Sequence, residues 1–275
     1  AALGGYTAVF AMANSLPVAD TAAVVEQVDR LGKESAWCRV QPIGAVTVGL
    51  KGERLSDIGG MANSTANVRV FSDDGMCVYD PAVMRRALEY VKTFDGVIAQ
   101  HAQGPRLTEG AQMNEGKVSA DLGLTGWPAV AEEAIIARDV LLAEHLDSKL
   151  HICHLSTKGS IEVVRWAKSR GVKVTAEATP HHLLLTDETA RTYDPIFKVN
   201  PPLRTEEDVL ALRQAVADGI IDVIGTDHAP HPVESKECEW SCAANGMTGF
   251  EQALSIIQMT FVEPGHITLA DVARL

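Results

Sequence analysis

Hydrophobic residues gather in seven short runs along the chain, and segments with helical spacing follow most of them. The runs are rich in valine and isoleucine and have the length of buried strands; they lie at residues 6–12, 39–48, 68–71, 97–100, 150–153, 172–176 and 220–224. Helices are predicted at residues 21–31, 53–61, 81–93, 129–146, 160–169, 206–217 and 250–260. Strands that alternate with helices favour a parallel sheet with the helices packed outside it.

The number of predicted strands points to one type of α/β fold. Seven strands are one fewer than a closed eight-stranded barrel contains. The sequence therefore predicts a TIM-type (β/α)8 barrel that is incomplete, with its first βα unit missing. Residues 1–5 resemble a helix end with a glycine stop, and residues 269–275 lie within another helical pattern. We accordingly expect residues 1–275 to form one barrel domain, truncated at both ends.

Composition narrows the class of protein. The 275 residues are 46% hydrophobic and carry a net charge of −12, which disfavours nucleic acid or an anionic membrane as a partner. No apolar run reaches the ~20 residues needed to span a bilayer. The five cysteines are odd in number and scattered, which is typical of a reducing compartment, so the sequence predicts a cytoplasmic protein.

Polar side chains follow the predicted strands at their carboxyl ends. The clearest case is GTDHAPH at residues 225–231, where Asp227 comes directly after an apolar run. Side chains at the ends of parallel strands converge on one face, and imidazole together with carboxylate suits zinc or a similar divalent ion. The other residues of this kind are Asn14, Asp73, Asp74, His101 and His154.

Several histidines have a competing structural interpretation. His151 and His154 are three residues apart on or beside a strand, so only one can face the predicted site, and we choose His154 because it lies nearer the carboxyl end. His181 and His182 are interpreted as residues that orient a loop rather than as ligands. A lone histidine is more often a core or surface residue, which is our interpretation of the remaining two, His145 and His266.

Segments spread over nearly the whole chain resemble one family. They are FSDDG at 71–75, HLST at 154–157, TPHH at 179–182, KVNPPLR at 198–204, GTDHAPH at 225–231 and GMTGFE at 246–251. In this order they look like a dihydroorotase of the bacterial class I type, a cyclic amidohydrolase of the metal-dependent hydrolase superfamily. The resemblance implies reversible, zinc-dependent hydrolysis and cyclisation between dihydroorotate and N-carbamoyl-L-aspartate in de novo pyrimidine biosynthesis.

The resemblance also implies a role for individual residues. His101 and His154 match ligands of one metal, and Asp227 matches a ligand of the other metal that also moves the proton. Asp74 matches the bridging aspartate, with Asp73 as the competing assignment. The substrate contacts match Asn14, Asn200 and His231, while Arg204 is either a further substrate donor or a structural ion-pair partner. One or two zinc ions are implied, and the implied partners are the substrate, aspartate transcarbamoylase and further copies of the chain.

The sequence departs from the family pattern in ways that leave three interpretations open. No His-x-His pair occurs in the 275 residues, Gln103 and Gly104 replace acidic residues, and the β-rich region formed by the termini is missing. We favour a piece of an active enzyme whose second metal site is incomplete. An inactive dihydroorotase-like scaffold subunit of aspartate transcarbamoylase is the first alternative. A hydantoinase or allantoinase is the second, disfavoured because residues 68–74 contain no bridging lysine.

Overall fold

The computed structural model describes residues 1–275, which divide into two compact units. The first unit contains Ala1–Gln103, Ile135–Cys153 and Ala167–Val174, and the second contains Gly104–Ala134, His154–Trp166 and Thr175–Leu275. Each unit is therefore assembled from separate stretches of the chain. The single barrel domain predicted from the sequence stays a prediction.

The first unit is built on parallel strands, as the alternating pattern predicts. These strands are β1 (Ala8–Ala11), β2 (Arg39–Pro42), β3 (Val70–Phe71), β4 (Val97–Gln100) and β7 (Leu150–Ile152). β1 pairs with β2, β3 with β4, and β4 with β7, all in parallel. A parallel bridge between Gly44 and Phe71 links the end of β2 to β3. The carboxyl ends of these strands consequently point in one direction.

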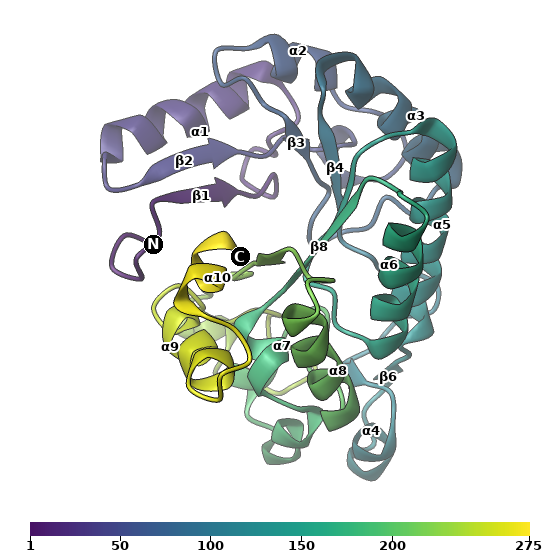
Figure 1. Cartoon of the computed structure of the whole chain (residues 1–275), viewed down its shortest axis with the longest axis vertical. Helices are drawn as coiled ribbons and strands as arrows, with labels where there is room; N and C mark the ends of the chain where they lie inside the picture. Colours follow the sequence, from purple (N-terminus) through teal and green to yellow (C-terminus); the bar gives the residue numbers. More distant parts are fainter. The chain divides into compact units, whose positions relative to one another are not determined.

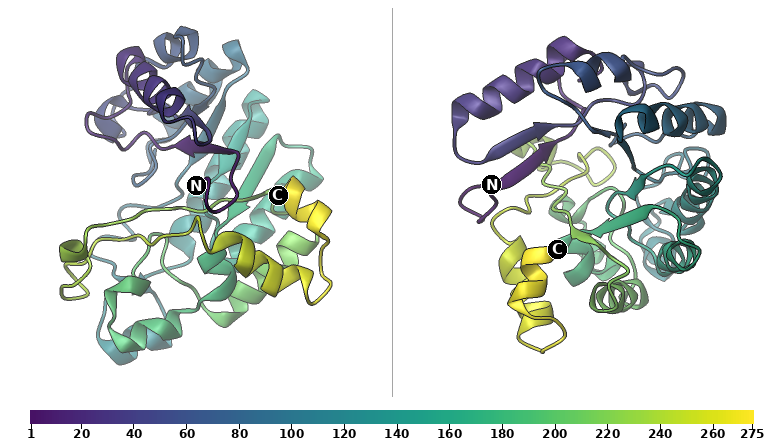
Figure 2. Two further views of the ribbon diagram at one scale, coloured as in Figure 1. Left: turned by 90° about the vertical axis from the view of Figure 1, so that its left-hand side faces the viewer. Right: turned by 45° about the horizontal axis from the view of Figure 1, so that its top comes forward.

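Helices pack beside the strands of the first unit. They are α1 (Ala22–Ser35), α2 (Ile58–Asn63), α3 (Pro81–Val91) and most of α5 (Val130–Leu146), with 3-10 turns η1 (Val48–Leu50) and η2 (Lys92–Phe94). α1 lies alongside β2 in Figure 1 and in the right-hand view of Figure 2. α3 begins where Asp80 accepts hydrogen bonds from the backbone of Ala82 and Val83, with Pro81 in the first turn.

The second unit has fewer strands and more irregular structure. Its strands are β5 (Met113–Asn114), β6 (Gly126–Trp127), most of β8 (Val174–Ala178) and β9 (Val223–Ile224), and its helices are α4 (Lys117–Leu122), most of α6 (Lys158–Ser169), α7 (Pro180–Leu184), α8 (Glu206–Ala217), α9 (Ala253–Ile257) and α10 (Leu269–Arg274). The unit also contains the 3-10 helices η3 (Asp187–Thr192), η4 (Pro195–Phe197) and η5 (Val233–Ser235) and the π-helix η6 (Gln258–Val262). β8 and β9 pair in parallel, as do β5 and β6. α9, η6 and α10 are the yellow segments in Figure 1.

The predicted elements are present, with shorter strands than expected. All seven predicted strands are found, as β1, β2, β3, β4, β7, β8 and β9. The sequence missed β5, α4 and β6, which lie in what was expected to be a long loop, and it missed α7 in a stretch expected to be irregular. No helix of the structure combines the length and apolar composition that crossing a membrane requires.

A buried polar network joins the end of β4 to the segment before α3. The Gln100 amide donates to Asp139 Oδ2 at 2.8 Å and also bonds the backbone of Val78. Arg138 donates to Asp139 Oδ1 from Nε at 2.7 Å and to the carbonyls of Val78 and Tyr79. Burial raises the pKa of Asp139 from 3.8 to about 6, because desolvation outweighs the attraction of Arg138.

We expect Asp139 to make stability depend on pH. Its pKa is higher in the folded chain than in the unfolded chain, so its stabilising contribution is fully present below about pH 4 and is lost as the pH rises through about 6. The shift corresponds to about 3 kcal/mol. Urea unfolding of the parent and of Asp139→Asn tests this. Between pH 4 and pH 7, the free energy of unfolding of the parent should fall by up to about 3 kcal/mol more than that of the variant. A difference that does not change with pH would contradict this assignment.

Candidate metal centre and substrate pocket

Two predicted metal ligands meet at the strand ends of the first unit. Asp74 follows β3, and His101 follows the last residue of β4. His101 Nδ1 lies 3.4 Å from Asp74 Oδ1, and the two side chains are nearly closed to solvent, with His101 2% exposed and Asp74 8%. The other ring nitrogen of His101 lies 3.0 Å from Gln103 Oε1. A buried imidazole and a buried carboxylate at this distance are chemically suited to share a divalent cation.

The neighbouring aspartate, Asp73, is engaged with the backbone. Its Oδ1 accepts from the N–H groups of Val46 at 2.8 Å and Thr47 at 2.9 Å, and its Oδ2 accepts from the Thr47 hydroxyl. Burial raises the pKa of Asp73, although these hydrogen bonds oppose the shift. The carboxylate of Asp73 thus holds the segment after β2, whereas that of Asp74 faces His101. This geometry favours Asp74 over Asp73 as the ligand.

Asn14 lies beside the same segment. It follows β1 on an exposed position, and its side-chain amide donates to the backbone carbonyl of Asp74 at 3.4 Å. The first unit therefore brings together three of the residues selected from the sequence, namely Asn14, Asp74 and His101.

In the second unit, Glu177 of β8 lies between two segments that carry predicted ligands. Its Oε1 accepts from the backbone N–H of His154 at 3.1 Å. On the other side, a β-carbon placed on Gly225 would overlap Glu177 Oε2, so a larger residue at the start of the segment that carries Asp227 would displace the Glu177 carboxylate. His154 is 4% exposed, and both His154 (φ +32°) and Asp227 (φ +45°) adopt positive φ angles. Glu177 thus binds the backbone of His154 and packs against the segment that leads to Asp227.

His228 has a structural role that its position beside Asp227 did not reveal. Its Nδ1 accepts from the N–H of Gly249 at 3.0 Å, and its ring stacks on Phe250 with centroids 4.1 Å apart. Burial lowers the pKa of His228, which keeps Nδ1 available as an acceptor. The backbone of Ala229 also donates to Met247. These contacts fasten residues 246–250 onto the segment that follows Asp227.

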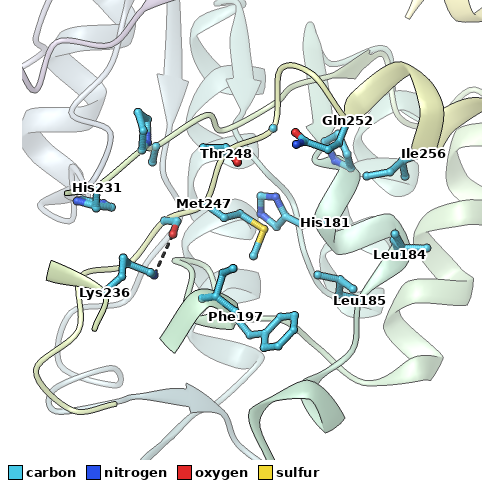
Figure 3. Close-up of a pocket in the computed structure, with 16 residues that line it drawn as sticks. His181, Leu184, Leu185, Phe197, His231, Lys236, Met247, Thr248, Gln252 and Ile256 are labelled. Carbon is cyan, nitrogen blue, oxygen red and sulfur yellow. Dashed lines mark hydrogen bonds between the residues drawn. The ribbon is translucent and has the colours of Figure 1, made fainter. Parts of the chain in front are cut away.

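A pocket of about 390 Å³ opens beside these residues within the second unit. Most of its lining is apolar, and Figure 3 shows His181, Phe197 and Met247 directed into the same space. Residues 246–249 line one wall, next to His231, whose Nε2 donates to the carbonyl of Asn245 at 2.8 Å. Gly246 has φ +139°, and a β-carbon there would overlap Ala229. The pocket has a volume typical of a small-molecule site.

Two lysines hold the wall of this pocket by their ammonium groups. Lys236 Nζ donates to the carbonyls of Lys198 at 3.2 Å, Ala244 at 2.8 Å and Gly246 at 3.0 Å, and the last of these bonds is drawn in Figure 3. Lys198 Nζ donates to the carbonyl of Trp240 at 2.6 Å. Burial lowers the pKa of both lysines. The segment from residue 235 to 246 is therefore tied down by donors from inside the chain.

The adjacent histidines of α7 behave differently from each other. His182 is buried, accepts from the Thr179 hydroxyl at 2.7 Å and donates from Nε2 to the carbonyls of Pro201 at 3.1 Å and Pro202 at 3.2 Å. It thus orients the loop that carries Asn200. His181 is 4% exposed, its Nε2 has no hydrogen-bond partner, and burial lowers its pKa to about 3. A neutral imidazole of this kind lines the pocket.

The remaining predicted residues, Asn200, Arg204 and His231, lie in the second unit. Asn200 is half-buried on the loop between η4 and α8, and His231 is exposed at the mouth of the pocket. Arg204 is buried among protein groups and does not line the pocket, which supports its structural alternative. Sequence reasoning missed Glu177, although an acidic residue inside the otherwise uncharged run 174–178 is a usable signal.

Comparisons with known proteins place these features in context. The family model described as "Dihydro-orotase-like" matches residues 1–160. Dihydroorotase of Streptomyces coelicolor is 71% identical over 99% of this chain and 64% of its own length. Dihydroorotase of Leifsonia xyli subsp. xyli is 67% identical over 100% of this chain and 63% of its own length. The corresponding protein of Mycobacterium tuberculosis is 54% identical over 100% and 64%. The chain therefore spans slightly less than two thirds of these relatives.

Solved structures resemble the chain in fold. The L-hydantoinase (dihydropyrimidinase) from Arthrobacter aurescens superimposes with a TM-score of 0.86 at 23% identity, over 100% of this chain and 62% of that one. A dihydropyrimidinase from Brevibacillus agri gives 0.80 at 18% identity, over 100% and 62%. At such identities the likeness shows the fold alone. It confirms the incomplete TIM-type α/β fold predicted from the sequence, and the strand pairings do not close into a ring.

Proposed function

The chain belongs to the dihydro-orotase-like family, and from this premise we propose that it is the barrel portion of a dihydroorotase. Such an enzyme interconverts dihydroorotate and N-carbamoyl-L-aspartate, a step of de novo pyrimidine biosynthesis. The relatives named dihydroorotase support this proposal through identities of 54 to 71% over the whole chain. The structural observation that carries it is the buried pair of Asp74 and His101 at the strand ends.

The proposed metal ligands are Asp74, His101, His154 and Asp227, a set of carboxylates and imidazoles that suits zinc. One or two zinc ions are expected, and the second site is expected to be incomplete because the sequence has no His-x-His pair. A bound zinc ion would lower the pKa of water and polarise the ring carbonyl. Asp227 is proposed to accept the proton of the attacking water and to deliver it to the leaving ring nitrogen.

The substrate is proposed to bind through fixed hydrogen-bond donors. Asn14, Asn200 and His231 would hold its carboxylate and ring, and the backbone of residues 246–249 would contact the ring edge. Support comes from the position of Asn14 beside Asp74 and from His231 and residues 246–249 at the pocket. Aspartate transcarbamoylase and further copies of the chain stay expectations as partners. A cytoplasmic location is also proposed, supported by the five free cysteines.

The two alternatives receive less support from the structure. A pure scaffold has no physical need for a buried carboxylate facing a buried imidazole, which is the arrangement of Asp74 and His101. Hydantoinases share the fold, but the bridging lysine expected of hydantoinases and allantoinases is missing from residues 68–74. The substrate therefore has to be tested directly.

The test is a side-by-side assay of the zinc-loaded chain with dihydroorotate, hydantoin and allantoin. We expect turnover of dihydroorotate to exceed that of the other two substrates, with bound zinc quantified by elemental analysis. Preferential cleavage of hydantoin or allantoin would overturn the choice of substrate. A chain that binds no zinc and cleaves none of the three would favour the scaffold alternative.

A further inference from the structure

We propose that Arg204 is a positioning residue that locks the Asn200 loop to the segment carrying His154. This inference rests on the proposed function, because it concerns a proposed metal ligand and a proposed substrate contact. Arg204 lies four residues after Asn200, and its bonding partner Ser156 lies two residues after His154. The connection lies wholly within the second unit.

The guanidinium of Arg204 is surrounded by protein acceptors. Its Nε donates to Ser156 Oγ at 3.0 Å, and one terminal nitrogen donates to Asn114 Oδ1 and to the carbonyl of Trp127, both at 3.1 Å. The other terminal nitrogen lies 3.6 Å from Glu132 Oε2, and the guanidinium carbon lies 5.8 Å from the centre of the Trp127 ring. With 1% exposure, this side chain is directed into the protein and away from solvent.

Glu132 completes the link to the His154 segment. Its Oε1 accepts from the backbone N–H of Ser156 at 2.9 Å and from that of Thr157 at 3.3 Å, and its Oε2 accepts from the Ser156 hydroxyl. The Ser156 hydroxyl thus donates to Glu132 and accepts from Arg204. The backbone directly after His154 is consequently held by the buried carboxylate of Glu132 and, through the Ser156 hydroxyl, by the buried guanidinium of Arg204.

The Asn200 loop is held at the other end of the same network. The carbonyl of Arg204 accepts from the N–H of Asp187 at 2.8 Å, and Asp187 Oδ2 accepts from the Asn114 amide at 3.0 Å. His182 donates to the two carbonyls that follow Asn200. Arg204 itself belongs to the Asn200 loop and its guanidinium bonds Ser156, so this side chain joins the loop to the His154 segment.

An arginine side chain is chemically suited to hold the two segments together. Its five donors point in a rigid planar fork, so one side chain can bond several acceptors in fixed directions, which a lysine ammonium cannot reproduce. A buried charge that loses a partner is costly, so the network resists distortion. Arg204 does not line the pocket, which separates it from the residues proposed to contact the substrate.

The test compares Arg204→Lys with Arg213→Lys, a matched control. Arg213 is half-buried and donates to the carbonyl of Leu183 at 2.7 Å, outside the two segments. Zinc affinity is measured by chelator competition on protein shown by circular dichroism to be folded. We expect Arg204→Lys to weaken zinc binding by about 10- to 100-fold, the range for partners that orient a ligand. Arg213→Lys should change it little, and Ser156→Ala should act in the same direction as Arg204→Lys.

A second measurement keeps the proposal decidable if the chain binds no zinc. Hydrogen exchange of the Arg204→Lys variant should show faster exchange at residues 154–157 and 198–204, with segments that Arg204 does not contact unchanged. Equal protection of both segments in parent and variant, or equal loss in Arg213→Lys, would overturn the positioning role. A parent chain without zinc or turnover would instead overturn the proposed function, while the exchange data would still decide the role of Arg204.

Discussion

Asp227→Asn is expected to lower kcat for dihydroorotate by about 10²- to 10⁴-fold, the usual contribution of a general acid–base group. The amide has the shape of the carboxylate but cannot take up the proton of the attacking water. Asp227 is half-buried at φ +45°, and asparagine tolerates this backbone conformation well, so the fold should survive. Steady-state kinetics of the zinc-loaded variant, with unfolding measured in parallel, test this expectation.

The control for this substitution is Asp218→Asn, which also removes one carboxylate from the second unit. Asp218 is at the surface, where it pairs with Arg165. Its loss should leave kcat unchanged and cost little stability. If Asp227→Asn retained the kcat of the parent with full zinc content, the proposed proton transfer would be wrong.

Asp74→Asn is expected to weaken zinc binding, whereas Asp73→Asn is expected to lower folding stability. Asp74→Asn should weaken zinc binding by at least about 10-fold with little loss of folding stability, because a neutral amide is a poor ligand for a divalent cation. Asp73→Asn should lower the free energy of unfolding by about 1–3 kcal/mol, because its carboxylate accepts from Val46 and from Thr47. Zinc titration and urea unfolding of both variants separate the two effects.

The two adjacent aspartates act as controls for each other. They have the same chemistry and lie one residue apart, so any general effect of removing a negative charge is shared. Stronger loss of zinc in Asp73→Asn than in Asp74→Asn would reverse the assignment. Equal behaviour in both measurements would show that neither carboxylate has the separate role inferred from its contacts.

The fold was largely predictable because its strands are apolar runs and its longer helices carry clear boundary signals. Pro81 after Asp80 marks the start of α3, and Thr205 with Asp208 forms the capping box of α8. The missed elements depend on distant residues instead. Met113 of β5 and Val118 of α4 pack against Trp240, more than a hundred positions away, so no local pattern announces them.

The candidate site was predictable only in part for a related reason. The sequence places Asp74, His101 and His154 after strands. The structure brings the side chains of Asp74 and His101 to within 3.4 Å of each other in the first unit. The choice between Asp73 and Asp74 depends on the backbone donors of residues 46 and 47, which no spacing in the sequence reveals. The role of Arg204 likewise depends on its buried acceptors.

Lys236, which supports the pocket wall, makes the structure of this wall independent of any bound ion. Three carbonyl oxygens converge on Lys236 Nζ, much as they would around a small coordinated ion in a cage. Here the cation is covalently attached to the polypeptide and cannot be exchanged. Agents that strip metals from proteins would therefore leave this part of the architecture assembled, because no exchangeable ion holds it.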